Sequence, residues 1–359
     1  MMPLFSPTRL SFFLATLEVL LQSTALAYAE AKLPRQGTVS QADWTAYTSR
    51  FVTSDGRVVD DGNGNISHSE SQGYGLLLAY LANDEATFDQ IWTFTKTNLW
   101  LRDDGLFVWK WDPNSKPHIT DPNNASDGDI LIAYSLALAN RAWNRPELKA
   151  SAERIARAIS EKLLFKHDDA WLLSPAAEGF SAKDRPDGPV VNLSYWVFEA
   201  MPVLADLLST QEWEELSVAG LQLVQDARFG PDALPSDWIS VRASAAPADG
   251  FPAEFGYNAI RVPLYLMRAG YLSPPLLLPF LSAMAPAENG LAIIDVETGA
   301  IKKRLTDPGY AAIGTALQCV LAGGASSEKL RTFEPTLYYP STLHLLVLSY
   351  INEHHPRCR

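Results

Sequence analysis

The sequence contains little of what identifies several common protein classes. It has two cysteines and five methionines among 359 residues, and no Lys/Arg-rich run interrupts a chain whose formal net charge is −12. An acidic chain repels phosphate, so nucleic acid is excluded as a partner class. No HExxH or other paired histidine spacing is present, and GxSxG is also absent. We therefore expect no metal, no cofactor and no serine hydrolase chemistry of the nucleophile-elbow kind.

The chain also has no long apolar run downstream of its N-terminal segment. No stretch there reaches the ~20 residues of a membrane-spanning helix. The N-terminus itself has Arg9, an apolar stretch and a small-residue site ending at Ala29, which is typical of a secretory signal peptide. Glu18 within the apolar stretch also fits a buried first helix. We expect residues 1–29 to be a signal peptide and residues 30–359 to form a single domain without a membrane anchor, periplasmic or secreted.

The two cysteines, Cys319 and Cys358, both lie far downstream in the chain and form no CxxC motif. An exported protein could join them in a disulfide. Two free thiols fit the sequence equally well, and neither reading points to a function.

Apolar residues recur at helical spacing through most of the chain, whereas strand-like alternation is scarce. The spacing predicts helices near 41–52, 70–82, 84–98, 128–143, 147–164, 192–208, 211–227, 258–269, 275–285, 306–322 and 340–352. These helices, close to twelve in number, come in pairs joined by short turns. Longer irregular segments separate the pairs at 99–126, 165–191, 228–256 and 286–305. The rhythm predicts an all-α toroid of helical hairpins whose long loops build a site at one end.

Aromatic residues concentrate in the long loops and at helix starts, at Trp109, Trp111, Trp196, Trp238, Tyr257 and the pair Tyr338–Tyr339. Pyranose rings present apolar C–H faces that stack on such side chains, while sugar hydroxyls need Asp, Asn and Arg partners. Any single aromatic residue could instead belong to the core. The grouping favours a carbohydrate ligand.

Two acidic segments precede strongly apolar helices. The first, SESQGYGL, contains Glu70, and the second, NNASDGDILIAY, contains Asp127 and Asp129. Helix capping by Ser126 or Asp127, with acids favoured in a first helical turn, is the ordinary explanation of the second segment. One acid satisfies that need, so the other is a candidate for catalysis or ligand binding.

The segment ASDGDILIAYSLALANRAW resembles the signature of glycoside hydrolase family eight. SESQGYGL, YNAIRVPLY and LYYPSTLHLL are similar to further segments of that family, so the resemblance spans the chain. It implies an (α/α)6 barrel with a substrate groove at one end. The nearest members it suggests are the periplasmic endoglucanases of bacterial cellulose synthesis. A monomeric cellulase that hydrolyses β-1,4-glucan with inversion, with a functional link to a cellulose synthase complex, is therefore expected.

The resemblance also assigns roles to residues. Glu70 takes the place of the proton donor, and Asp127 that of the central aspartate, which would hold the distorted sugar at the cleavage point. Arg261 would bind hydroxyls or hold a carboxylate. The expected sugar-binding platforms are Trp109, Trp196, Tyr257 and Tyr339.

This sequence differs from the family pattern at the position of the catalytic base. The family has an aspartate after the tyrosine of a YDAxR-like segment, and this chain has Asn258 there. A neutral amide can position water but cannot take its proton at useful strength. Candidate bases are Glu254, Asp249, Asp60, Asp61 and Asp127 itself.

The departure keeps other functions open. The chain could be a glycan-binding protein whose turnover is impaired, or an enzyme specific for chitosan, xylan or mixed-linkage glucan. A purely structural helical scaffold is a third reading, and it predicts no cluster of acids at one end of the toroid.

Overall fold

The computed structural model describes residues 33–284, 290–323 and 327–359. Residues 33 to 359 form one compact unit. The predicted signal peptide lies outside the described residues. Within them, every helix is too short or too polar to cross a membrane.

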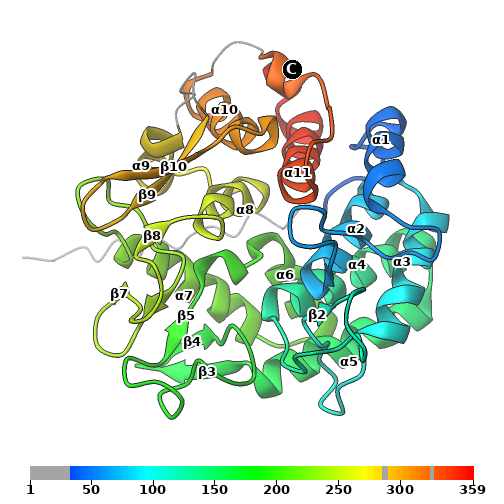
Figure 1. Ribbon diagram of the computed structural model, residues 1–359, viewed down its shortest axis with the longest axis horizontal. Coiled ribbons are helices and arrows are strands. Elements are labelled where there is room, and N and C mark those ends of the chain that lie inside the picture. The colour runs from blue at the N-terminus through cyan, green and yellow to red at the C-terminus, as the bar shows by residue number, and fades with distance from the viewer. Residues whose placement is uncertain (1–32, 285–289, 324–326) are drawn as a thin grey trace, which may run out of the picture. The chain divides into compact units, whose positions relative to one another are not determined.

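Six helices form the inner ring of a barrel (Figure 1). They are α2 (Ser69–Ala82), α4 (Ser126–Trp143), α6 (Met201–Leu208), α8 (Val262–Arg268), α10 (Pro308–Ala322) and α11 (Tyr338–His354). Neighbours in this order contact one another, α6 and α8 doing so through the 3-10 turn η2 (Phe198–Ala200), and α11 closes the ring on α2. The helices α2, α4 and α11 are buried over most of their surface, as their nearly continuous apolar sequences require.

Five helices pack outside this ring, each against an inner neighbour. They are α1 (Gln41–Phe51), α3 (Glu85–Asn98), α5 (Pro146–Lys162), α7 (Glu212–Asp226) and α9 (Pro274–Met284). Unlike the inner helices, they bury one face, as α5 does with Leu148, Ala152, Ile155 and Ile159. Between α10 and α11, the described residues contain a single 3-10 turn, η4 (Glu328–Leu330). The described chain therefore has eleven α-helices, and the predicted (α/α)6 fold is confirmed.

Two inner helices begin later than predicted, α6 at Met201 and α8 at Val262. A proline lies in the first turn of each, where its missing N–H group costs no helical hydrogen bond, whereas a helix that began several residues earlier would need that N–H as a donor. The residues upstream form 3-10 turns instead, η1 (Leu193–Tyr195) and η2 before α6 and η3 (Ala259–Arg261) before α8. These turns carry side chains of the site described below.

The long loops carry short antiparallel strands that the sequence did not reveal. The pairings are β1 (Ser67–His68) with β2 (Lys110–Trp111), β3 (Leu164–His167) with β4 (Ala170–Leu173), β6 (Ile239–Ser240) with β5 (Val190–Val191) and β7 (Ala246–Pro247), and β9 (Leu291–Asp295) with β8 (Glu254–Phe255) and β10 (Ile301–Leu305). Six of these ten strands have only two residues, which is too short to show an alternating pattern, and the five-residue strands β9 and β10 do not alternate between buried and exposed residues.

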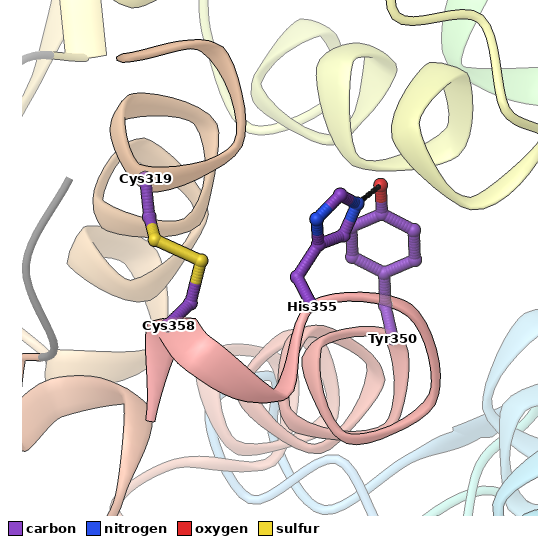
Figure 2. Close-up of a disulfide and its surroundings, with 4 residues drawn as sticks. All are labelled: Cys319, Tyr350, His355 and Cys358. Carbon is purple, nitrogen blue, oxygen red and sulfur yellow. Dashed lines mark hydrogen bonds between the residues drawn. A yellow bond between two sulfur atoms is a disulfide. The ribbon is translucent and has the colours of Figure 1, made fainter. Parts of the chain in front are cut away.

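The two cysteines form a disulfide between α10 and the 3-10 turn η5 (Pro356–Cys358) that follows α11 (Figure 2). Next to it, the hydroxyl of Tyr350 and Nε2 of His355 are hydrogen-bonded at 3.0 Å. The structure therefore resolves the choice between paired and free cysteines, and the covalent link fixes the C-terminal end of α11 to α10.

Candidate active site

A cleft of about 230 Å³ lies at the N-terminal ends of α2, α4 and α11, where the η3 segment meets them. The structure brings seven of the eight predicted site residues to its wall: Glu70, Trp109, Asp127, Tyr257, Asn258, Arg261 and Tyr339. Segments nearly 270 residues apart in the chain thus meet in one place. A cluster of acids is present at one end of the barrel, which is contrary to the scaffold reading.

Glu70 is held in the first turn of α2 by a reciprocal cap. Nδ1 of His68 accepts the backbone N–H of Ser71 at 3.0 Å, and Oγ of Ser71 accepts the backbone N–H of His68 at 3.0 Å. This capping box fixes where the helix starts. The carboxylate of Glu70, with 19% of its side chain exposed, therefore faces the cleft from a defined position.

The two acids at the start of α4 have different tasks. Both carboxylate oxygens of Asp129 accept hydrogen bonds inside the protein. Oδ1 accepts the backbone N–H of Phe107, and Oδ2 accepts a hydrogen bond from Nδ2 of Asn124, both at 2.8 Å. Asp127 instead lines the cleft. The N-cap of α4 is Ala125, without a side-chain cap hydrogen bond, so capping is not the role of this acidic segment.

A glycine lets the first turns of α2 and α4 approach closely. A Cβ atom on Gly128 would lie 2.1 Å from Oγ of Ser69 and 2.6 Å from the backbone nitrogen of Glu70. A side chain at this position would force the two helix starts apart. The absence of a side chain at Gly128 therefore allows Glu70 and Asp127 to share one site.

Arg261 joins the two carboxylates. Its Nη1 donates to Oε1 of Glu70 at 2.6 Å, and its Nη2 donates to Oδ2 of Asp127 at 2.7 Å. A third contact runs from Nη1 to the hydroxyl of Tyr74 at 3.3 Å. Burial and the neighbouring Glu70 carboxylate raise the pKa of Asp127 to about 7. One guanidinium compensates one of two negative charges, so the site can hold a proton.

Aromatic side chains with fixed orientations form the cleft walls. The indole N–H of Trp109 donates to Oδ2 of Asp121 at 2.8 Å, and the hydroxyl of Tyr339 donates to the carbonyl of Tyr257 at 2.7 Å. Tyr195, which the sequence did not single out, also lines the cleft. It adjoins Trp196 in the segment NLSYW, and nothing in that pattern distinguished the two.

The prediction for Trp196 is wrong. Its side chain is 0% exposed, its indole N–H donates to the carbonyl of Leu216 at 3.0 Å, and it packs against Gly220 of α7. The 3-10 turn η1 ends at Tyr195 and turns the next residue into the core. Trp196 therefore stabilises the barrel and cannot stack on a sugar.

Trp111 and Trp238 are half-buried and stack on neighbouring side chains. Trp111 stacks on the ring of His118 and contacts the guanidinium of Arg57, and Trp238 stacks on two phenylalanines, Phe180 and Phe251. Neither lines the cleft, so the aromatic grouping in the sequence mixed site residues with packing residues.

Two of the five candidate bases line the cleft, and three lie outside its lining. Asp60 lines the cleft, as Asp127 does, and its Oδ2 lies 3.3 Å from Nε2 of His68. Asp61 accepts the backbone N–H of Tyr338 at 2.8 Å and is outside the lining. Two more lie outside it: Glu254, paired with a lysine of β10, and Asp249, which is exposed.

Asn258 faces a carboxylate that the sequence analysis did not consider. Its Nδ2 lies 3.5 Å from Oδ2 of Asp237, a buried residue just before β6. The only sequence signal was its position in the loop 228–256. In the described residues, no group of three or more His, Cys, Asp or Glu side chains could hold a metal ion.

Comparisons with known proteins agree with this architecture. A curated relative, a probable endoglucanase from Novacetimonas hansenii, is 37% identical over 320 residues, covering 88% of this chain and 91% of that protein. An endoglucanase from Klebsiella pneumoniae, a family 8 glycosyl hydrolase, superposes with a TM-score of 0.79 at 30% identity, covering 87% of this chain and 100% of that one. The endo-β-1,4-glucanase of Acetobacter xylinum superposes with a TM-score of 0.78 at 34% sequence identity, covering 88% of this chain and 98% of that one.

The sequence profile described as glycosyl hydrolases family 8 matches residues 18–353, nearly the whole chain. This match and the relatives above confirm the resemblance found in the motifs. The chain belongs to glycosyl hydrolase family 8 and is an enzyme of the glycoside hydrolase class.

Proposed function

We propose that this enzyme is an endo-β-1,4-glucanase that hydrolyses cellulose chains with inversion. The observation that carries the proposal is the bridge from Arg261 to both Glu70 and Asp127 on the wall of an aromatic-lined cleft. The relatives named endoglucanase support the same activity.

Glu70 is the proton donor in this mechanism. It reaches the cleft from the first turn of α2, and its Oε1 is bound by Arg261. Because Arg261 also binds Asp127, it compensates only one of the two carboxylates. Proton transfer from Glu70 to the leaving oxygen, as water attacks the opposite face of the sugar, gives an inverted product.

Asp127 holds the sugar at the point of cleavage. Its Oδ1 accepts the backbone N–H of Gly128 and its Oδ2 is bound by Arg261, so the carboxylate cannot rotate freely. Hydrogen bonds from a fixed carboxylate to sugar hydroxyls strengthen as the ring distorts toward the transition state. Asp60 and Asp127 are the two candidate bases that line the cleft.

Trp109, Tyr257 and Tyr339 serve as platforms for sugar rings, and Tyr195 replaces Trp196 in this role. Flat aromatic faces suit the apolar faces of glucose units. The same walls could accept xylan, chitosan or mixed-linkage glucan, so a panel of these polymers is needed to define specificity.

Export to the periplasm or the medium is a further part of the proposal. The pairing of Cys319 with Cys358 supports it, because disulfides persist mainly in oxidising compartments. The functional link to a cellulose synthase complex and the monomeric state rest on the resemblance of the motifs alone.

A second candidate function is glycan binding without turnover. It is favoured by one observation, the amide of Asn258 on the cleft wall where the motif leads one to expect a carboxylate. It predicts that the unmodified protein binds cello-oligosaccharides but releases no new reducing ends.

The test compares wild-type protein with Glu70→Gln on carboxymethyl cellulose. An endo-acting enzyme lowers the viscosity much faster than it releases reducing ends, and the variant loses at least about 10²-fold in kcat. Proton NMR of the first-formed anomer reports inversion. Binding without hydrolysis by the wild type would reject the proposed activity in favour of the second candidate.

A further inference from the structure

Asn258 stands on the cleft wall with a buried carboxylate behind it. Its Nδ2 lies 3.5 Å from Oδ2 of Asp237, whose exposure is 7%. Asp237 lies outside the lining of the cleft, so it can act on a substrate only through a neighbour.

The second oxygen of Asp237 holds the backbone around Asn258. Its Oδ1 accepts the N–H of Gly256 at 3.0 Å and the N–H of Ala259 at 2.8 Å. Gly256 permits this approach, since a Cβ there would lie 2.6 Å from Oδ2 of Asp237. One carboxylate thus fixes the chain on both sides of Tyr257 and Asn258.

The pairing also decides which end of the amide faces the cleft. An ionised carboxylate only accepts hydrogen bonds, so the NH2 group of Asn258 must be the part that faces Asp237. The amide oxygen diverges from the NH2 group by about 120° in the same plane. It therefore points away from Asp237 and offers the cleft an acceptor without a charge.

We propose that Asp237 is a positioning residue that orients the amide of Asn258 so that its Oδ1 accepts a hydrogen bond from the attacking water. This inference rests on the proposed hydrolase function. Asn258 orients the water and does not take its proton, because a neutral amide is too weak a base. Burial raises the pKa of Asp237, while the N–H groups of Ala259 and Gly256 favour its charged form.

The decisive variant is Asp237→Asn. In this variant the remaining amide oxygen can still accept the N–H groups of Gly256 and Ala259. An NH2 group takes the place of the Oδ2 atom that faces Asn258, so the amide of Asn258 is free to turn. We expect kcat to fall about 10-fold to 10²-fold with KM within about two-fold, since misplacing a reacting group costs rate rather than binding.

The exchange variant Asp237→Asn/Asn258→Asp is the rescue. The new carboxylate at 258 then accepts from the new amide at 237, so the pair is restored with its charge on the cleft side. We expect kcat to return at least to the wild-type value. Asn258→Asp alone places two carboxylates face to face and should remain below the double variant.

Asp187→Asn is the matched control. Asp187 is buried to a similar degree, accepts Nε of Arg185 at 3.0 Å and the N–H of Asp249 at 2.8 Å, and lies outside the cleft lining. It should lower Tm and leave kcat unchanged. This separates loss of a buried carboxylate from loss of a positioned water.

The results distinguish two failures. Wild-type turnover together with an unchanged kcat in Asp237→Asn, or no rescue by the exchange variant, overturns the positioning role alone. No turnover by the wild type overturns the hydrolase proposal and this inference with it. Should Asp237→Asn not fold, Asn258→Ala serves instead, and an unchanged kcat in that variant equally overturns the inference.

Discussion

Arg261 and Asp127 form a buried ion pair at the cleft, with Nη2 and Oδ2 2.7 Å apart and 1% of each side chain exposed. Removing two charges from water is costly, and their attraction repays the cost only when the geometry is good and further polar partners are present. Here those partners are Glu70 on the guanidinium and the N–H of Gly128 on the carboxylate. The pair therefore defines the geometry of the site more than it stabilises the barrel.

The first prediction concerns Arg261→Lys. A single ammonium cannot span two carboxylates as the planar guanidinium does, so we expect a loss of about 3–5 kcal/mol in unfolding free energy and at least about 10²-fold in kcat. Thermal unfolding and hydrolysis of carboxymethyl cellulose measure the two effects. The control is Arg268→Lys, because Arg268 binds Glu199 through two nitrogens in an equally buried pair away from the cleft. It should lose stability but keep kcat, and equal activity losses in both would contradict a special role for Arg261.

The second prediction is a dependence of stability on pH. The pKa of Asp127 is raised from 3.8 to about 7, so the folded state binds a proton there that the unfolded state has released. Stability contributed by this group is present at low pH and is lost as the pH rises from about 4 through about 7. The Asp127→Asn variant lacks this titration. Its unfolding free energy relative to wild type should therefore improve across that window, and a constant difference in denaturant titrations between pH 4 and pH 8 would refute the assignment.

The third prediction separates two tryptophans that lie close in sequence. Trp109 lines the cleft, whereas Trp111 lies outside the lining and stacks on His118, so Trp109→Ala should raise KM for cello-oligosaccharides by up to about 10-fold, as the loss of one stacking contact implies. Trp111→Ala should mainly lower Tm. Steady-state kinetics and thermal unfolding of both variants test this, and the reverse pattern would show that Trp109 is not a platform.

The fourth prediction concerns the disulfide between Cys319 and Cys358, which closes a loop with a sequence separation of 39. A chain-entropy argument gives about 4 kcal/mol of stabilisation for such a loop. The bond follows the C-terminal end of α11, whereas Tyr339 lies in the first turn of that helix, and 17 residues span about 25 Å. Replacing both cysteines by serine should therefore lower Tm and leave kcat at 25 °C unchanged. A proportional fall in kcat of the folded variant would mean that the site depends on the link.

Local sequence patterns predicted most of the helices correctly. The start of α4 and the spacing of α5 carry enough apolar periodicity to define an element without tertiary contacts. α6 and α8 begin several residues later than predicted because Pro202 and Pro263 have no N–H group to donate within a helix that starts further upstream. The two-residue strands could not be predicted from the sequence, because their pairing depends on segments distant in the chain.

The sequence by itself determined the barrel of helical hairpins and the family, and it selected Glu70, Asp127 and Arg261 as candidate site residues, because these depend on periodicity and on motifs that are contiguous in the chain. Tertiary structure alone decided that Trp196 is core while Tyr195 faces the cleft, that Asp60 lines the cleft while Glu254 does not, and that Asp237 stands behind Asn258. Burial and hydrogen-bond partners are set by residues far away in the chain, and no local pattern encodes them.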